Sequence, residues 1–169
     1  RKVASFELGN PRSLAVDDAG TLYIVDVGTN HIVKVPRDGV AVTMSSAGIE
    51  RIAAPIAVSV NKEGTLVVAD LDDNAVYKVT SKATISVGKA DGAAPLSGPA
   101  GGVLDSKGNI FVANNSDGTI VKITEAGEST PFAGKSGDVG STDGKGVDAR
   151  FMKPRAIAID DKDNLYVAD

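Results

Sequence analysis

The sequence predicts an all-β protein assembled from repeats of one four-stranded antiparallel unit. Sixteen-residue stretches that begin at a proline align without gaps, with anchors at Pro11, Pro55, Pro99 and Pro154. Within them the apolar residues alternate or form short runs and never follow the 3.6-residue period of a helix. Glycine, asparagine and aspartate recur at fixed offsets between the apolar segments, as is typical of tight turns between strands.

Each repeat contains apolar segments that we expect to form strands. The anchors are 44, 44 and 55 residues apart, so the last repeat carries 11 extra residues before its proline. The expected first strands are 14–16, 58–60, 102–104 and 157–159, and the second strands are 22–25, 66–69, 110–113 and 165–168. The expected third strands are 32–35, 76–79 and 120–123, and the fourth strands are 3–6, 40–44, 84–87 and 130–133.

Repeated side chains indicate how these strands pack. Small residues such as Ala15 and Ala158 occupy the middle of the first strands, as a crowded inner strand requires. The second strands share an aromatic position that we expect in the core, filled by Tyr23, Phe111 and Tyr166. The third strands share a lysine that we expect to point outward, namely Lys34, Lys78 and Lys122.

The turns repeat independently of the strands. The turn between the first and second strands has as its fourth residue Gly20, Gly64, Gly108 or Asp163. The turn between the second and third strands has at one position Asn30, Asn74 or Gly118. These residue types adopt a positive φ at the lowest cost, so both turns are expected to use the left-handed region.

A repeat of about 44 residues with four antiparallel strands is the sequence form of a β-propeller blade. The chain begins on an expected fourth strand and stops on an expected second strand. We therefore interpret residues 1–169 as one partial β-propeller domain with about four blades. Because a blade buries its apolar faces only against its neighbours, the isolated segment is expected to associate through open blade edges.

The repeat resembles the NHL repeat, whose pattern is Pro-x-x-h-x-h-Asp-x-x-Gly-x-h-aromatic-h-Ala-Asp, where h is an apolar residue. The resemblance is clearest in residues 11–35 and 154–169, and residues 143–151 are similar to a loop of many bacterial NHL-repeat proteins. The second and third repeats depart from it at Asn61, Val67, Gly101, Gly102 and Asn114. The resemblance implies a six-bladed ring of which these blades form a part, and a bacterial protein that is secreted or lies on the cell surface.

The composition excludes several classes of function. The net charge is −4 without basic clusters, which argues against a nucleic-acid partner. The absence of cysteine excludes a disulfide scaffold, a thiolate zinc site and a cysteine nucleophile. The longest apolar runs have about five residues, whereas a membrane helix needs roughly 20, so no membrane insertion is expected. No cofactor is expected.

Two patterns could suggest a catalytic or metal site. His31 is the only histidine, and we interpret it as a turn residue because it adjoins Asn30. Asp26, Asp70 and Asp169 end their second strands and could suggest a ring of metal ligands. Each recurs in its own blade, however, so we interpret each carboxylate as an acceptor for backbone N–H groups of its turn, and we expect no metal.

The repeats differ most in the loops before the first strands and in those between the second and third strands. These loops share one face, which we call the variable loop face. Its candidate binding residues are Asn10, Arg12, Thr29, Asp72, Asp117, Asp143, Lys145, Arg150 and Arg155. Arg12 and Arg155 follow their anchor prolines, and a guanidinium group there can bind a carboxylate or phosphate. The 11 extra residues break the symmetry of this face, and we expect Phe151 to anchor them.

These features predict a non-catalytic scaffold that binds a protein, a peptide or a glycan through the variable loop face. Two alternatives stay open. The chain could be part of a related propeller enzyme of the lyase or lactonase kind, whose catalytic histidine and metal ligands lie outside this segment. It could also be a structural spacer within a longer chain.

Overall fold

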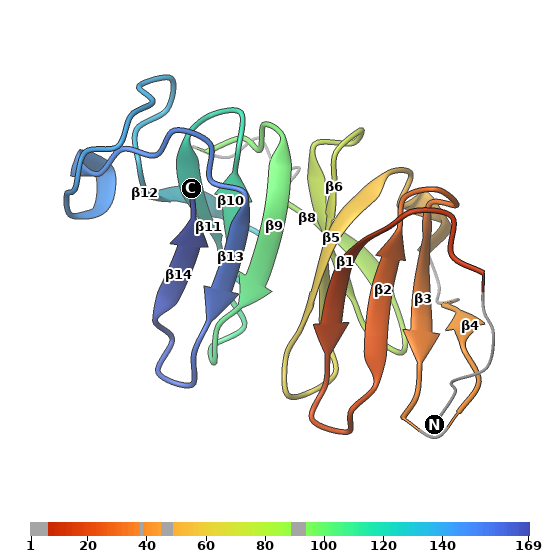
Figure 1. The fold of residues 1–169 in the computed structure, drawn as a ribbon. Coiled ribbons are helices and arrows are strands. Elements are labelled where there is room, and N and C mark those ends of the chain that lie inside the picture. Colours follow the sequence, from red (N-terminus) through yellow and green to blue (C-terminus); the bar gives the residue numbers. More distant parts are fainter. Residues whose placement is uncertain (1–6, 38, 45–48, 89–93) are drawn as a thin grey trace.

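The computed structural model describes residues 7–37, 39–44, 49–88 and 94–169. Its strands form three four-stranded antiparallel sheets and one two-stranded antiparallel sheet (Figure 1). Within each sheet the neighbouring strands follow one another in the chain. Within these ranges the helical elements are two short 3-10 turns, η1 (Ile49–Arg51) and η2 (Gly146–Asp148). The all-β prediction is confirmed.

The four sheets correspond to the four repeats. The first contains β1 (Pro11–Val16), β2 (Leu22–Asp26), β3 (His31–Val35) and β4 (Val42–Thr43). The second contains β5 (Pro55–Val60), β6 (Leu66–Asp70), β7 (Ala75–Val79) and β8 (Thr84–Val87). The third contains β9 (Pro99–Leu104), β10 (Ile110–Asn114), β11 (Thr119–Ile123) and β12 (Ser129–Ala133), and the last contains β13 (Ala156–Ile159) and β14 (Leu165–Ala168).

The predicted strands are present, with differences at their ends. β1, β5 and β9 begin at the anchor proline, three residues before the predicted start. In β1 the pairing shifts between Pro11 and Ser13, because proline has no N–H for the ladder and is accommodated at a bulge. The fourth strand predicted at 40–44 is shorter, and the one predicted at 3–6 lies outside the described residues.

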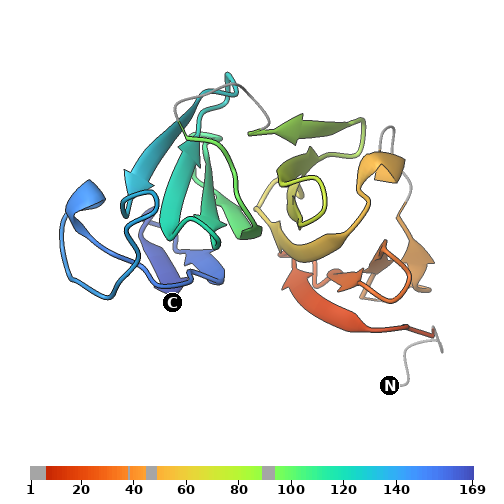
Figure 2. The same cartoon turned by 90° about the horizontal axis from the view of Figure 1, so that it is seen from above.

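The first strands of the repeats form the inner row of the molecule. β5 packs beside β1, β9 beside β5 and β13 beside β9. Viewed from above, the sheets fan out from this row as the blades of a β-propeller do (Figure 2). Three apolar clusters fill the spaces between successive sheets, with fully buried side chains such as Val68, Val112 and Ile120. Each sheet is therefore stabilised by its neighbours in the row.

Two predicted core residues are exposed at the end of the row. Tyr23 and Phe111 are buried as predicted, but Tyr166 is 60% exposed, and Ala158 on β13 is also exposed. The prediction was wrong for these two because β13 and β14 pack against the third sheet on one face only. On β1, at the other end of the row, Leu14 is exposed for the same reason.

Two of the three repeated lysines lie beside aromatic rings of the second strands, and Lys78 lies opposite Val67. Lys34 pairs with Tyr23 and Lys122 with Phe111 across neighbouring strands, and the Nζ atoms lie 5.8 and 5.9 Å from the ring centroids. The lysines are half-buried, and their third strands lie between the second and fourth strands rather than at the rim. Their stems cover the rings while the ammonium groups reach water.

The turn prediction is confirmed at all seven repeated positions. The φ angles run from 48° at Asn74 to 81° at Gly108, and Asp163 adopts 61° where the other repeats have glycine. Each of the two turn types thus fixes the direction of its own hairpin in the same way from repeat to repeat.

Adjacent glycines of β9 provide a matched test of crowding in the inner row. A Cβ added to Gly102 would lie 2.9 Å from Cγ1 of buried Val67, whereas one added to Gly101 would meet nothing closer than 3.5 Å. We expect Gly102→Ala to lower the free energy of unfolding by about 1–3 kcal/mol. Gly101→Ala should leave it unchanged or raise it by up to about 1 kcal/mol. Urea denaturation measures both, and equal midpoints would contradict the packing described for β9.

Candidate functional site

The carboxylate at the end of β2 organises the variable loop face in the first sheet. Asp26 is fully buried and accepts hydrogen bonds from the backbone N–H groups of Gly9 (2.8 Å), Asn10 (2.6 Å) and Gly28 (3.2 Å) and from Oγ1 of Thr29 (2.9 Å). The hydrogen bonds from Asn10 and Gly9 are the main reason that the pKa of Asp26 is lowered. The predicted role as a backbone acceptor is confirmed, and it extends to the loop before β1.

The other repeats place an equivalent residue at the same point. Asp70 accepts from the N–H groups of Ala53 (2.7 Å) and Ala54 (3.1 Å), and Asp169 from those of Met152 (2.9 Å) and Lys153 (2.7 Å). Each carboxylate accepts these hydrogen bonds from the loop that precedes the first strand of its own sheet. Among the described residues, no three His, Cys, Asp or Glu side chains are grouped so that they could hold a metal ion.

Asn114 occupies this position in the third sheet and uses both ends of its amide. Its Oδ1 accepts from the N–H of Ser97 at 2.6 Å, as a carboxylate would. Its Nδ2 donates to the carbonyl of Pro95 (3.3 Å) and to Oγ1 of Thr119 (3.2 Å). The third sheet thus offers a backbone carbonyl, which only accepts, where the first sheet offers three backbone N–H groups, which only donate, so Asp and Asn are each matched to their surroundings.

Several candidate binding residues are engaged within the fold. Thr29 donates to Asp26 from its side-chain hydroxyl, whereas Asn10 donates from its backbone N–H and has an exposed side chain. Asp117 accepts from Oγ of Ser136 (2.8 Å), which ties the inserted loop to the turn after β10. Arg150 forms an ion pair with Asp138 (3.0 Å) and donates from Nη1 to the carbonyls of residues 147 and 149 (2.9 and 2.8 Å). The side chains of Thr29, Asp117 and Arg150 thus shape the face.

The inserted loop, residues 134–153, folds back on itself and protrudes beyond β12 (Figure 1). The N–H of Gly134 donates to the carbonyl of Gly146 (3.1 Å), and that of Arg150 to the carbonyl of Thr142 (2.9 Å). Phe151 packs against the cluster between the third sheet and β13–β14, which confirms its anchoring role. Val139 and Val147 remain about half exposed on the loop, at 51% and 54%.

The remaining candidate residues have exposed side chains that are free among the described residues: Arg12, Asp72, Asp143, Lys145 and Arg155. The structure does not bring the two arginines together. Arg12 lies on β1 and Arg155 directly before β13, at opposite ends of the inner row (Figure 1). They therefore belong to separate contacts. His31 begins β3 with an exposed side chain beside the Asn30 turn, as predicted.

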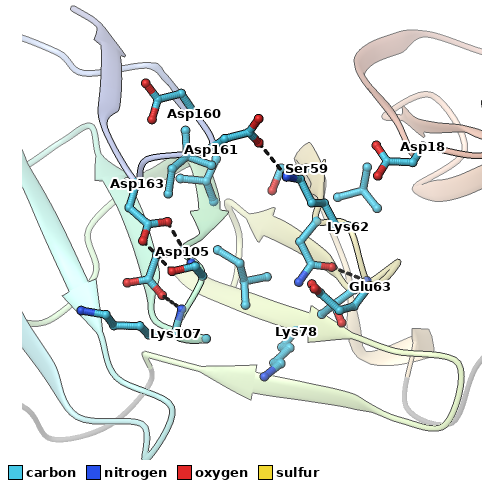
Figure 3. A pocket seen from close by; sticks show the side chains of 18 of the residues that line it. Asp18, Ser59, Lys62, Glu63, Lys78, Asp105, Lys107, Asp160, Asp161 and Asp163 are labelled. Carbon is cyan, nitrogen blue, oxygen red and sulfur yellow. Dashed lines mark hydrogen bonds and ion pairs between the residues drawn. The ribbon is translucent and has the colours of Figure 1, made fainter.

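A cavity that the sequence interpretation missed lies at the end of the molecule opposite the variable loop face. There the turns between first and second strands converge around a cavity of about 610 Å³ (Figure 3). The ends of the inner strands contribute apolar walls, including Val60, Leu104 and Ile159. The turn tips contribute charged groups, including Asp18 and Glu63. Its lining comes from four turns about 44 to 55 residues apart, and the sequence offered only their charged tips as a signal.

Much of the charge around this cavity links the turns. Lys62 Nζ lies 2.7 Å from Asp161 Oδ1, and Asp163 accepts from the N–H (2.9 Å) and Oγ (2.6 Å) of Ser106 (Figure 3). The hydrogen bond to Asp161 raises the pKa of Lys62, and the hydrogen bonds from Ser106 lower the pKa of Asp163. Asp160 accepts from the N–H of Asn164 within its own turn. These contacts hold the last turn to those of the second and third sheets.

Comparison with known proteins supports the fold. No protein-family model and no curated protein matches the chain. Among solved structures, a streptogramin B lyase superposes with a TM-score of 0.72 at 16% identity, covering 98% of this chain and 50% of that chain. Virginiamycin B lyase from Staphylococcus aureus gives 0.69 at 17% identity, covering 95% and 49%. An auxiliary nutrient binding protein from Bacteroides ovatus gives 0.67 at 19% identity, covering 94% and 45%.

These similarities show a β-propeller fold, and at such identities they show the fold alone. The chain spans about half the length of the solved structures it matches. Membership in the NHL family and a total of six blades therefore stay predictions. Within the described ranges, no helix combines the length and apolar character that crossing a membrane requires.

Exchanging Asp for Asn at the end of the second strand tests whether each residue is matched to the hydrogen-bond partners in its own sheet. We expect Asp26→Asn to destabilise the protein, because the new amide N–H₂ group would face backbone N–H groups, which cannot accept a hydrogen bond. Asn114→Asp should destabilise it as well, because a carboxylate would face the Pro95 carbonyl. Asp72→Asn on the exposed surface serves as the control and should leave the urea midpoint unchanged. Wild-type midpoints for both exchanged proteins would contradict the assigned hydrogen bonds.

The lowered pKa of Asp26 predicts sensitivity to acid. Its stabilisation is fully present above the unfolded value near 3.8 and is lost as pH falls through the lower folded value. We expect the melting temperature to hold between pH 7 and about 5 and to fall below about pH 4. Circular dichroism melts across this range measure it. The Asp26→Asn protein should show a shallower decline, and an unchanged decline would assign the acid sensitivity to other carboxylates.

Proposed function

We propose that this protein is a non-catalytic binding scaffold that engages a protein, peptide or glycan partner through the variable loop face. The observation that carries the proposal is that the inserted loop is held in place by its own contacts and still exposes side chains to a partner. Residues 134–153 are held by their own backbone hydrogen bonds and by the Arg150–Asp138 ion pair. The loop still exposes apolar and charged side chains. A loop that is ordered before binding loses less conformational entropy when a partner docks.

The surface around the loop has the mixed character of a recognition site. Val139 and Val147 offer apolar area, and Asp143 and Lys145 offer charges on the same loop. η2 packs against β12, whose Phe132 is 47% exposed and contacts the Phe111 ring edge-on. An exposed aromatic beside polar groups suits both peptide and sugar partners.

The comparisons are compatible with binding and with catalysis. The similar solved structures include two lyases and a nutrient binding protein, so the fold carries either kind of function. The free charges of the variable loop face favour binding here. A lyase-like or lactonase-like activity, with its histidine and metal ligands outside this segment, is the alternative function that an experiment must separate from it.

Charge reversal tests the proposed face. A peptide-display library and a glycan array are probed with the protein, and selected ligands are measured by calorimetry. We expect Arg12→Glu and Arg155→Glu each to weaken binding several-fold while leaving the melting temperature nearly unchanged, since both side chains are exposed. Lys107→Glu, on a turn at the opposite end, is the matched control.

Two results would contradict the proposal. Loss of binding in Lys107→Glu, with normal binding in both arginine variants, would assign recognition to the opposite end of the molecule. A stoichiometric metal in the purified protein, together with lactone hydrolysis that depends on this metal, would show that the protein is an enzyme and not a non-catalytic scaffold.

A further inference from the structure

The inserted loop contains an Asp–Gly pair, Asp143–Gly144, shortly before η2. Both residues are exposed. Within the described residues the carboxylate of Asp143 accepts no hydrogen bond, and the N–H of Gly144 donates none. These two groups are neighbours in the chain, and no protein partner holds them apart. They are therefore free to react with each other.

The reaction open to such a pair is the formation and opening of a cyclic imide. The amide nitrogen of Gly144 attacks Cγ of Asp143, a C–N bond forms, and the amide proton and the carboxyl hydroxyl group leave as water. Water then opens the imide. Addition at Cγ restores aspartate, whereas addition at the α-carbonyl gives isoaspartate, in which the main chain runs through Cγ. Glycine favours the first step because no Cβ hinders the approach of its nitrogen.

The other fully described Asp–Gly pair, Asp117–Gly118, has the same chemistry but is held by the fold. The carboxylate of Asp117 accepts hydrogen bonds from Oγ of Ser136 (2.8 Å) and from Oγ1 of Thr119 (3.2 Å). Gly118 is buried in the turn between β10 and β11. The carboxylate cannot turn toward the glycine nitrogen without losing both hydrogen bonds, so the fold protects this pair.

Two pairs in which serine follows are held as well. In Asp105–Ser106 the serine N–H donates to Asp163 at 2.9 Å. In Asn115–Ser116 the serine N–H donates to the carbonyl of Ser97 at 3.1 Å. The nitrogen that would attack is therefore engaged in each pair. Asp143–Gly144 differs from all three in that both of its reacting groups are free.

The loop is closed on both sides of Asp143 by backbone hydrogen bonds. The carbonyl of Thr142 accepts from the N–H of Arg150 at 2.9 Å, and the carbonyl of Gly146 accepts from the N–H of Gly134 at 3.1 Å. Isoaspartate would add a carbon atom to the main chain between these two carbonyls. The segment would then be too long for both hydrogen bonds to keep their geometry.

Crowding at Gly144 leaves no room for the longer segment. A Cβ added to this glycine would lie 2.6 Å from the backbone carbonyl carbon of Asp148. The main chain before η2 thus already touches the main chain at its end. The same contact requires glycine at position 144, so the fold itself keeps an unhindered nitrogen next to Asp143.

We propose that Asp143 is a site of spontaneous conversion to isoaspartate and that this conversion releases the inserted loop from its closed conformation. The reaction conserves mass and consumes only the water that it returns, so the modified form accumulates as the protein ages. The sheets are not affected, because the loop lies outside them. A loss of partner binding on modification rests on the proposed function, whereas the modification and the opening of the loop do not.

Peptide mapping of aged protein tests the site. The full chain is kept for weeks at physiological pH and temperature, then digested and analysed by mass spectrometry with fragmentation that distinguishes isoaspartate from aspartate. We expect isoaspartate to accumulate at Asp143 several-fold faster than at Asp117. In guanidinium chloride the two sites should react at comparable rates, because the fold no longer holds Asp117. The Asp–Gly pairs at 38–39 and 91–92, whose aspartates lie outside the described residues, are measured as separate peptides.

Equal accumulation at Asp117 and Asp143 in the folded protein would overturn the proposal, because the hydrogen bonds would then not select the site. Absence of isoaspartate at Asp143, at a time when the denatured chain has reacted, would overturn it as well.

Substitutions at the same position test the chemistry. Asp143→Glu should suppress the reaction, because the longer side chain closes its ring far more slowly, and it should leave the loop folded because the side chain is exposed. Asp143→Asn should react several-fold faster than the native protein, because ammonia leaves the amide at neutral pH more readily than water leaves the carboxylate. Asp72→Glu, on another exposed loop, is the matched control and should leave the rate at Asp143 unchanged. Unchanged rates in both Asp143 variants would overturn the mechanism.

Hydrogen exchange of the separated forms tests the opening of the loop. We expect the amides of Gly134 and Arg150 to exchange several-fold faster in the isoaspartate form than in the native form, while the amides of β10 exchange at the same rate in both. Aged Asp143→Glu protein should keep the native protection. Native protection at both amides of the isoaspartate form would overturn the proposed release. No partner is used, so this result stands apart from any failure of the proposed binding function.

Discussion

The hydrogen bonds accepted by the residue that ends each second strand are the interaction on which the rest of the structure depends. Each repeat must return the loop before its first strand to that point, and the loop arrives with backbone N–H groups that have no partner in a sheet. An unsatisfied buried N–H costs about 1–3 kcal/mol, so several at one point would open the blade. A carboxylate has about four acceptor sites on a single side chain, and Asp26 uses them for three N–H groups and a hydroxyl.

These hydrogen bonds separate the residues that build the variable loop face from the residues whose side chains are displayed on it. The backbone N–H of Asn10 and the hydroxyl of Thr29 are bound to Asp26, and the side chain of Arg150 is bound within the inserted loop. Arg12 and Arg155 follow the anchor prolines and project from a backbone that the carboxylates already hold in place. Recognition can therefore vary at these positions without changing the interactions that form the blade. Two arginines at opposite ends of the row, however, cannot enclose one small anion together.

The sequence was sufficient for features set by local chemistry. Asn30, Gly20 and Asp163 adopt positive φ because their own turns require it, and strand pairing follows from turns of fixed length. Features set by distant parts of the chain were not predictable in this way. The ion pair of Lys62 with Asp161 joins turns from two different repeats, and the cavity beside it exists only after four turns converge.

Tyr166 shows why a repeat pattern does not determine burial by itself. It has the same neighbour on the first strand as Tyr23 and an equivalent hydrogen bond to a turn carboxylate, yet its exposure is twelve times that of Tyr23, 60% against 5%. The difference lies in what packs against it, because a blade supplies only one side of each interface. Leu14 on β1 is exposed at the other end of the row for the same reason. Both ends of the row therefore carry side chains suited to an interior, and their exposure reflects the number of neighbouring blades rather than a different local fold.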